Sequence, residues 1–408
     1  MLPTPTLRTV LSVMRRLATG KASLPVLNTV RVQRTADFTA LTATNLDVAL
    51  TFTEHHDQPE PNTLRFFMEK ARRRNQPDLD LCIPFADLAE LAGKIDPRAI
   101  LAIRKEDDAW MLCGHGRDGT DWTRPVDTHE SAEFPMPMID PLKPARQTSI
   151  PAMARRLGQV IRMTSIDSTR YVLNGVHCSD SGELVATDGR RLGLSNRPPG
   201  WSVESGLTAG QSGCEPEVPT FILPQVAAEI VHHAFPPDAT PLVTMLSASK
   251  VSITHGPWQI VAKLIEGDYP NFRAVIPGEE NYPHCLSLGQ GEVTALAEML
   301  ARGKKNVRAA LCHTAVDGRS HWSVDLRMEG RVLCQRILQG HEDPDKVRAA
   351  RALAHLTKAS PLKITFDPNL LAPCLAGPGP ATLLLEAQHP ILVKRPGFTG
   401  VVMPMRDV

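Results

Sequence analysis

The chain has 408 residues, which is too long for a single hydrophobic core, so two or three domains are expected. Apolar residues make up 42% of it and charged residues 22%, as in soluble globular proteins, and no apolar run approaches the roughly 18 residues that span a membrane. The 45 Lys and Arg against 44 Asp and Glu give a formal net charge of +1, which excludes a uniformly basic protein. Any affinity for nucleic acid must come from local clusters of basic residues.

The first twenty residues lack the basic stretch, apolar core and cleavage site of a signal peptide, so we expect a cytoplasmic protein. The eight cysteines are scattered singly, without the paired spacings of zinc or redox sites, and are interpreted as reduced core thiols. A metal site assembled across the fold stays open as an alternative, because three cysteines adjoin a histidine: His177-Cys178, His284-Cys285 and Cys312-His313. Neighbouring residues of a strand point to opposite faces, which favours thiols, and we expect no metal and no cofactor.

Helix-like segments recur along the chain at intervals near 140 residues, far longer than a solenoid repeat, which indicates duplicated domains. One set of segments begins near Leu7, Ile150 and Gly291. A second set begins near Phe85, Pro224 and Asp367. The spacing between the two sets is similar in each unit, so we predict three similar domains over residues 1–144, 145–281 and 282–408.

Between these helices the sequence alternates apolar and polar residues in short runs bounded by Gly, Pro, Asn and Asp, as antiparallel strands do. Each domain would then be of the α+β class, with two helices packed on antiparallel sheets. In the first helix the apolar residues follow helical spacing and should face a sheet, which leaves Arg8 and Arg15 outside. The apolar set is Leu7, Val10, Leu11, Met14 and Leu17.

Two stretches interrupt the repeat. Residues 55–80 contain Lys70 and three consecutive arginines, Arg72 to Arg74, and form either an inserted surface loop or a short basic helix. Residues 343–358 have the pattern of an additional helix in the third unit.

One glycine pattern, Gly114-x-Gly116-x-x-Gly119, resembles a dinucleotide fingerprint. Such a fingerprint must open a helix, whereas the residues that follow, Thr120 to Pro125, are strand-like, so a hairpin turn is predicted instead. The sequence also lacks a nucleophile elbow, a Walker loop, a His-Glu-x-x-His pattern and a carboxylate pair suited to acid–base work. We therefore expect a protein that is not an enzyme.

Several segments resemble the bacterial DNA polymerase sliding clamps, the β subunits of replicative DNA polymerase III holoenzymes. They are TRYVLNG (169–175), VATDGRRLGL (185–194), KLIEGDYPNFRAVIP (263–277), VVMPMR (401–406), LPVLN (24–28) and LTATNLD (41–47). The resemblance covers all three units in order and is weakest over residues 306–360. It implies the DNA-clamp fold and a head-to-tail homodimer that closes a ring of six domains around duplex DNA, since near-equal domains can tile a circle.

A clamp that slides needs contacts with phosphates and none with base edges. Helix periodicity predicts that Arg15, Arg155 and Arg302 make such contacts with double-stranded DNA. The resemblance adds Lys21, Arg170 and Tyr171, which lie on loops that touch DNA in the family.

The resemblance also implies a hydrophobic site for short partner peptides that end in Leu and Phe, borne by the replicative polymerase, the clamp loader and repair proteins. Methionine suits such a site because its flexible thioether adapts to different partners. The expected residues are Leu173, Thr187, Gly189, Arg190, Arg191, Leu192, Pro270, Val275, Pro390, Val402, Met403, Pro404 and Met405. A buried C-terminal strand would explain the valines equally well, but not Met-Pro-Met.

The sequence departs from the family pattern at Ala274, where a basic residue is frequent, and at Leu370, where an aromatic residue is frequent. The stretches 55–80 and 306–360 lie in the units that form the family's dimer interface. The function expected is that of a processivity factor, and the alternative is a clamp-like peptide-binding adaptor that no longer encircles DNA.

Overall fold

The computed structural model describes residues 4–18, 22–56, 78–96, 98, 101–136, 146–198, 220–303, 306–316, 319–329, 331–342, 362–387 and 389–405. The chain forms two compact units. Unit 1 comprises Met1–Ala154, Gly206–Gly210 and Val226–Leu264, and unit 2 comprises Arg155–Ser205, Gln211–Gln225 and Ile265–Val408. Over the described ranges, every helix is too short or too polar to cross a membrane.

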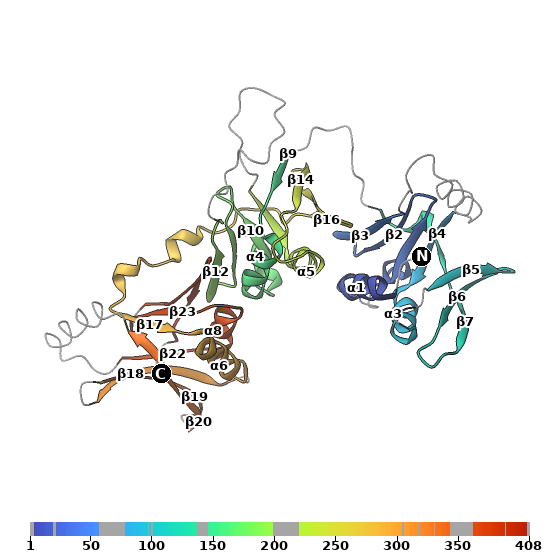
Figure 1. The fold of residues 1–408 in the computed structure, drawn as a ribbon. Helices are drawn as coiled ribbons and strands as arrows, with labels where there is room; N and C mark the ends of the chain where they lie inside the picture. Colours follow the sequence, from blue (N-terminus) through green and yellow to red (C-terminus); the bar gives the residue numbers. More distant parts are fainter. Residues whose placement is uncertain are drawn as a thin grey trace, which may run out of the picture. The chain divides into compact units, whose positions relative to one another are not determined.

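One order of elements, a helix, four strands, a helix and three strands, occurs three times along the chain (Figure 1). The first copy is α1 (Thr4–Met14), β1 (Thr29–Arg34), β2 (Phe38–Thr44), β3 (Val48–His55), β4 (Leu79–Pro84), α3 (Phe85–Lys94), β5 (Ala102–Glu106), β6 (Ala109–His115) and β7 (Asp121–Val126). The second is α4 (Met153–Val160), β10 (Gly175–Cys178), β11 (Leu184–Thr187), β12 (Arg191–Ser195), β13 (Phe221–Pro224), α5 (Gln225–Ala234), β14 (Leu242–Ser247), β15 (Lys250–His255) and β16 (Trp258–Lys263).

The third copy is α6 (Gln290–Ala301), β18 (Arg308–Val316), β19 (Arg319–Met328), β20 (Arg331–Leu338), β22 (Lys363–Phe366), α8 (Pro368–Leu375), β23 (Ala381–Leu385), β24 (Ile391–Arg395) and β25 (Phe398–Val402). Short strands flank the copies: β8 (His129–Glu130), β9 (Arg146–Ser149), β17 (His284–Leu288) and β21 (Gly340–Glu342). The six helices predicted from the repeat are all present, and the α+β class is confirmed. The domain boundaries after residues 144 and 281 stay predictions.

The described strands form four antiparallel sheets. Unit 1 holds a nine-stranded sheet of order β8-β4-β1-β2-β3-β16-β15-β14-β9 and a three-stranded sheet β5-β6-β7. Unit 2 holds a nine-stranded sheet of order β13-β10-β11-β12-β25-β24-β23-β17-β21 and a four-stranded sheet β20-β19-β18-β22. The pairing of β3 with β16, here called the first junction, and of β12 with β25, the second junction, each join two copies of the repeat.

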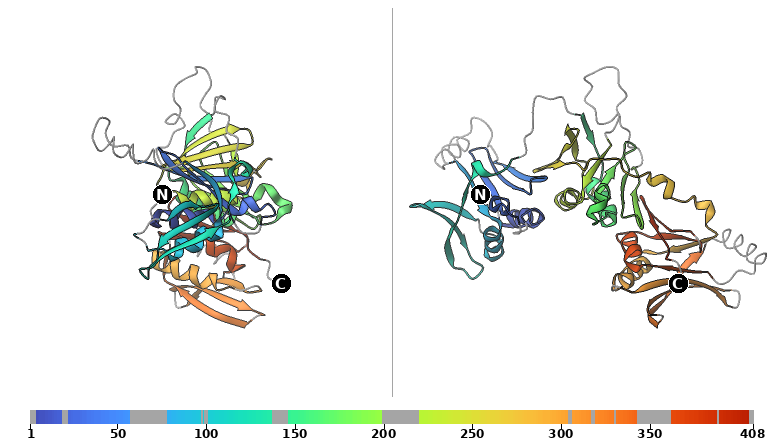
Figure 2. Two further views of the ribbon diagram at one scale, coloured as in Figure 1. Left: turned by 90° about the vertical axis from the view of Figure 1, so that its right-hand side faces the viewer. Right: turned by 180° about the vertical axis from the view of Figure 1, so that it is seen from behind.

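Helices α1 and α3 pack together in unit 1 (Figure 2). The predicted apolar face of α1 is confirmed, since Leu7, Val10, Leu11, Met14 and Leu17 are each at most 4% exposed. Arg8 is half-buried rather than on the outer side. Its guanidinium donates to the carbonyls of Ala92 and Ile95, both at 2.5 Å, because the last carbonyls of α3 lack partners within their own helix.

The glycine pattern at 114–119 forms the predicted hairpin turn between β6 and β7. Gly119 has a φ of +83°, which a glycine adopts without strain, and the N–H of Gly116 donates to the carbonyl of Thr120 at 2.7 Å. Most of residues 55–80 and all of 343–358, for which an insertion and a helix were predicted, lie outside the described residues. Among the described cysteines, Cys82, Cys113, Cys178 and Cys374 are buried as expected, whereas Cys334 is exposed.

Candidate functional site

The turn between β11 and β12 is rigidly built from its own side chains. The Asp188 carboxylate accepts from the N–H groups of Arg190 and Arg191 at 2.9 and 3.0 Å. The Thr187 hydroxyl donates to the Arg191 carbonyl at 2.6 Å and accepts from the Gly189 N–H at 3.1 Å. Gly189 has a φ of +85°, a conformation that side chains disfavour. Four of the predicted site residues are therefore held in one fixed turn.

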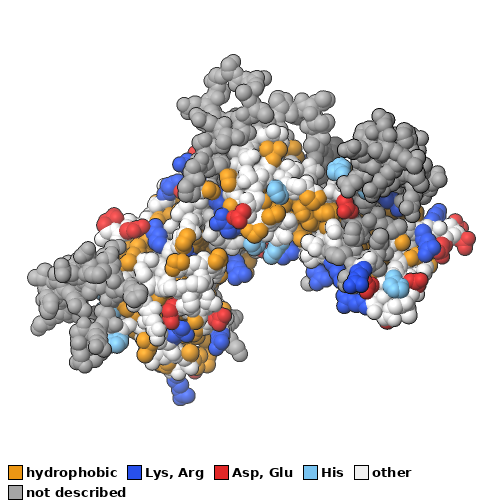
Figure 3. Space-filling view, viewed as in Figure 1, with side chains coloured by type: hydrophobic (Ala, Val, Ile, Leu, Met, Phe, Trp, Pro, Cys, Tyr) orange, Lys and Arg blue, Asp and Glu red, His pale blue; other side chains and the backbone are white. Residues whose placement is uncertain are grey.

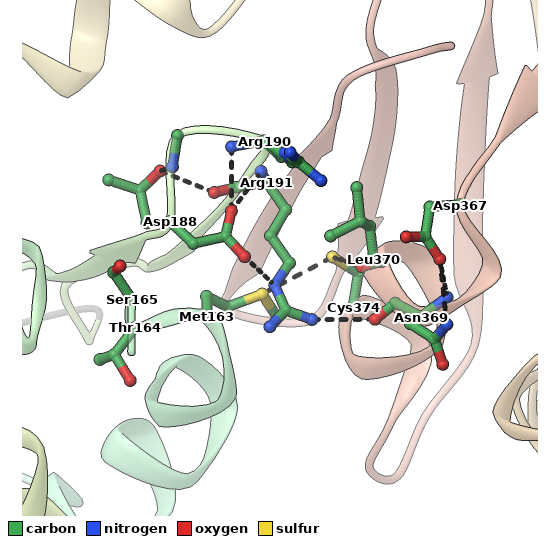
Figure 4. A network of polar contacts seen from close by, with 12 residues as sticks. Met163, Thr164, Ser165, Asp188, Arg190, Arg191, Asp367, Asn369, Leu370 and Cys374 are labelled. Carbon is green, nitrogen blue, oxygen red and sulfur yellow. Dashed lines mark hydrogen bonds and ion pairs between the residues drawn. The ribbon is translucent and has the colours of Figure 1, made fainter. Parts of the chain in front are cut away.

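Arg191 connects this turn to helix α8 within unit 2 (Figure 4). Its Nε lies 3.0 Å from Oδ2 of Asp188, and its Nη1 donates to the carbonyl of Asn369 at 2.9 Å. The Arg191 and Asp188 side chains are 15% and 19% exposed, so water screens the pair only partly. Asp367 caps the same helix by accepting from the Asn369 N–H at 2.9 Å. The planar guanidinium thus fixes the start of α8 against the turn.

The C-terminal segment lies directly beside the turn. Val402 of β25 pairs with Arg191, and the Met403 N–H donates to the Arg190 carbonyl at 2.9 Å. The Met405 N–H then donates to the Thr365 carbonyl at 2.7 Å. Met403 and Met405 are each 37% exposed, and Pro404 between them is half-buried. The backbone bonds therefore present two thioethers at the surface next to the turn, and we call Thr187–Leu192 together with Val402–Met405 the junction site.

The other predicted site residues also belong to unit 2. Leu173, 7% exposed, ends the 3-10 helix Ser168–Leu173, and Leu192, 3% exposed, pairs with Val401. Pro390 precedes β24, and its carbonyl accepts from the Tyr282 hydroxyl at 2.6 Å. Pro270 and Val275 belong to the segment after β16 and are exposed, Val275 by 43%.

Beneath the junction site, small residues let two sulfur side chains reach the sheet. Gly193 and Gly400 pair across the second junction, where an added Cβ would lie 3.0 Å from Met163 Cγ or 3.1 Å from Cys374 Sγ. The Cys374 thiol lies 3.8 Å from Met163 Sδ. Burial raises the pKa of Cys374 to about 12, so it stays protonated and packs as an apolar group.

Sequence reasoning missed two residues that organise this site, Asp188 and Asn369. The Asp188-Gly189 pair carries a recognisable turn signal, whereas Asn369 contributes only a carbonyl and leaves no signal. Arg170, predicted to contact DNA, lies close to the turn: an added Cβ on Gly189 would be 2.9 Å from its Nη1. The Arg170 guanidinium therefore lies beside the junction site.

The other residues predicted to contact DNA are all on the surface where they are described. Arg15 follows α1, Arg155 lies on α4 and Arg302 ends α6, each exposed. Tyr171 is 57% exposed, and Arg170 Nε is 4.0 Å from the Asp167 carboxylate. Lys21 lies outside the described residues. Basic and acidic side chains are interspersed over the face in Figure 3, in keeping with the net charge of +1.

No protein-family model matches the chain. A search for individual relatives does find similar proteins, which are beta sliding clamps. The chain is 29% identical to that of Treponema pallidum over 133 residues, 32% of each protein. It is 24% identical to that of Escherichia coli over 264 residues, 63% of this chain and 62% of the relative, and 24% identical to that of Caulobacter vibrioides over 291 residues, 68% and 69%. The matched region thus spans between a third and about two thirds of these relatives' length.

Solved structures extend the similarity along the chain. The DNA polymerase sliding clamp of Bacillus subtilis has a TM-score of 0.71 at 15% identity, covering 100% of this chain and 98% of that one. A sliding clamp of Bartonella birtlesii, solved bound to griselimycin, has a TM-score of 0.72 at 17% identity, covering 100% and 99%. The chain is a distant relative of the beta sliding clamps and has their α+β clamp fold.

Proposed function

We propose that the chain is a DNA sliding clamp, a non-catalytic processivity factor that closes a ring as a head-to-tail homodimer. The single observation that carries this proposal is the strand order at the two junctions. At each junction, the third strand of one copy of the repeat pairs with the last strand of the next: β3 with β16, and β12 with β25. The strands that remain are β20, third in the last copy, and β7, last in the first copy.

Among the described strands, β20 and β7 each stand at the edge of a sheet. On β20 three apolar side chains, Val332, Leu333 and Ile337, are 51%, 55% and 67% exposed. An edge strand with exposed apolar residues is a template for pairing with another chain. A second copy would supply β7 to β20 and β20 to β7, and two such contacts close the ring.

Within this proposal, duplex DNA passes through the ring and meets basic side chains such as Arg15, Arg155 and Arg302, which attract phosphates irrespective of sequence. The junction site binds short peptides of a replicative polymerase, a clamp loader and repair proteins in the cytoplasm. The chemistry of the two methionines supports this peptide binding, because Met403 and Met405 offer adaptable apolar surface on a hydrogen-bonded backbone.

A second candidate function is that of a peptide-binding adaptor that does not encircle DNA. The residues of β7 favour this candidate. Pro125 lacks an N–H, and Thr123, Arg124 and Pro125 are all exposed. A strand of this kind is a poor partner for β20.

Sedimentation of the full chain separates the two candidates. A ring has twice the chain mass of 44.6 kDa at micromolar concentration, whereas a strict monomer would rule out the ring. Retention on circular DNA is the second measurement. A ring that has been loaded on a nicked plasmid should stay bound through a salt wash and slide off when the plasmid is linearised.

A further inference from the structure

The turn between β2 and β3 in unit 1 has the same internal hydrogen bonds as the turn of the junction site. Thr44 Oγ1 accepts from the Leu46 N–H at 3.1 Å and donates to the Val48 carbonyl at 3.0 Å. The corresponding distances at Thr187 in the junction site are 3.1 and 2.6 Å. The first and second copies of the repeat therefore build this turn in the same way.

Each of the two turns also accepts a backbone hydrogen bond from the strand that pairs across its junction. The Lys263 N–H donates to the Asp47 carbonyl at 2.7 Å, and the Met403 N–H donates to the Arg190 carbonyl at 2.9 Å. Lys263 thus has the place at the first junction that Met403 has at the second. Unit 1 therefore contains a backbone framework equivalent to that of the junction site.

Leu46 occupies a position of the turn that favours glycine. Its φ is +80°, and the equivalent residue of the junction site, Gly189, has a φ of +85°. A leucine in this left-handed conformation costs free energy, because its Cβ comes too close to the following carbonyl oxygen. Leu46 is also 59% exposed, so burial within the chain does not offset this cost. A strained residue with an exposed apolar side chain indicates a contact with another molecule.

Two lysines lie next to this turn, on β15 and β16. Lys250 and Lys263 are Cα partners, and like charges directly opposite each other on a sheet are unfavourable. Lys263 is exposed and Lys250 is half-buried. Neither lysine forms an ion pair with a described residue, and the exposed Asp47 carboxylate forms none either. An acidic group from a partner would relieve the repulsion between the lysines.

We propose that Leu46, Lys250 and Lys263, here called the Leu46 surface, form a second docking surface for partner proteins. It takes a peptide segment in which an apolar side chain adjoins an acidic one. The inference rests on the proposed peptide binding at the junction site, whose backbone framework it shares. Because a lysine replaces Met403 at the equivalent place, the two surfaces select different peptides, acidic at the Leu46 surface and uncharged at the junction site.

The test measures binding of two labelled peptides to the full chain by fluorescence anisotropy. One peptide repeats Asp-Leu-Glu-Phe, and the other is an uncharged peptide that ends in Leu-Phe. Wild type should bind the acidic peptide saturably, with a dissociation constant below about 1 mM that rises as salt is added. Leu46→Asn should weaken binding of the acidic peptide roughly fivefold or more and leave the affinity for the uncharged peptide unchanged.

The lysines are tested by the double variant Lys250→Gln/Lys263→Gln. It should weaken binding of the acidic peptide roughly fivefold or more and remove most of the salt dependence. Leu24→Asn and Lys105→Gln are the matched controls in the same unit. Leu24 is 50% exposed with an ordinary φ of −91°, and Lys105 is exposed on β5. Both controls should bind the acidic peptide as wild type does.

Urea unfolding separates a docking role of Leu46 from a structural one. Asparagine tolerates the left-handed conformation better than leucine does, because its short polar side chain can form local hydrogen bonds. Leu46→Asn should therefore keep or raise the urea midpoint while it weakens peptide binding. A leucine needed for packing would instead lower the midpoint when replaced, and that result would contradict the docking role.

The outcomes also separate this inference from the proposed function. If the acidic peptide does not bind wild type, or binds the Leu46 and lysine variants with unchanged affinity, the inference is overturned. Binding of the uncharged peptide would then still support the junction site. If neither peptide binds and the chain sediments as a monomer, the inference and the proposed function are both overturned. Loss of acidic-peptide binding in the Leu46 and lysine variants, with both controls unchanged, supports the inference.

Discussion

The two junctions inside the chain differ sharply from β7, a strand at the edge of its sheet. At the first junction Trp258, Ile260 and Ala262 of β16 are 8%, 0% and 0% exposed, and at the second junction Phe398, Val401 and Val402 of β25 are 2%, 2% and 0% exposed. On β7, Thr123, Arg124 and Pro125 are exposed, and Trp122 is half-buried. The three strands have equivalent places in the repeat, but β16 and β25 have a neighbouring strand on each side, whereas β7, among the described strands, pairs only with β6.

Strand β7 also lacks a backbone N–H donor that β16 and β25 have at the equivalent position. The Lys263 N–H donates to the Asp47 carbonyl at the first junction, and the Met403 N–H donates to the Arg190 carbonyl at the second. Alternate residues of a strand direct their N–H groups to the same side, so Val261 and Val401 also donate across their junctions. The equivalent residue of β7 is Pro125, which cannot donate. The edge of β7 is thus intrinsically weaker than either internal junction.

The largest expected effect is a loss of unfolding free energy on substitution at the first junction. Trp258→Ala removes a buried ring that packs edge to face on Phe52, with centroids 4.8 Å apart and an angle of 71°. Truncating a buried aromatic residue costs about 3–5 kcal/mol of unfolding free energy. The equivalent change on the unpaired strand, Trp122→Ala, should cost clearly less in the isolated chain. Urea unfolding of both variants measures the difference, and equal losses would mean that β7 is already packed like β16.

The next largest effect is expected on dimer formation, after a substitution on β20. Leu333→Asp places a charge on a strand that, in the proposed ring, is covered by β7 of a second copy. Burying an unpaired carboxylate at such a contact costs several kcal/mol, so the dimer should dissociate at micromolar concentration. Ile166→Asp is the matched control, because Ile166 is 93% exposed and lies on a loop of the same unit. Sedimentation checks both, and an unchanged mass for Leu333→Asp would remove β20 from the interface.

These differences mark where the sequence was informative. Helix periodicity placed the apolar face of α1, and the strand-like residues after Gly119 predicted the β6–β7 hairpin, because these signals are local. The pairing of Trp258 with Phe52 joins residues some two hundred positions apart, and no local pattern specifies it. Within the candidate site, the Met-Pro-Met segment was recognisable, but the bond from Arg191 to the Asn369 carbonyl depends on tertiary packing. For the same reason, the capping contact of Arg8 with α3 was not predicted.

A third experiment exchanges the residues that end the two junctions. Met403 and Lys263 occupy equivalent places, so only the second junction presents a thioether there. Met403→Lys should weaken binding of a labelled peptide ending in Leu-Phe by at least roughly tenfold, about 1.4 kcal/mol, since an apolar contact is replaced by a hydrated charge. Lys263→Met is the control and should leave peptide affinity unchanged. Fluorescence anisotropy measures the peptide affinity of both variants. An unchanged affinity in Met403→Lys would mean that the peptide binds elsewhere.

The smallest effect, and the only gain, is expected from Pro125→Val, which gives β7 the residue that β16 and β25 carry at the equivalent position. The substitution restores one N–H to the free edge of the strand, and a backbone hydrogen bond contributes about 0.5–1.5 kcal/mol net. The dimer dissociation constant should fall roughly two- to tenfold, while the unfolding free energy of the monomer changes little. Pro84→Val, at the end of β4, is the control, because it alters a strand away from both edges in question. If Pro125→Val leaves the dissociation constant as it was, β7 does not pair through this edge, and the adaptor interpretation gains at the expense of the ring.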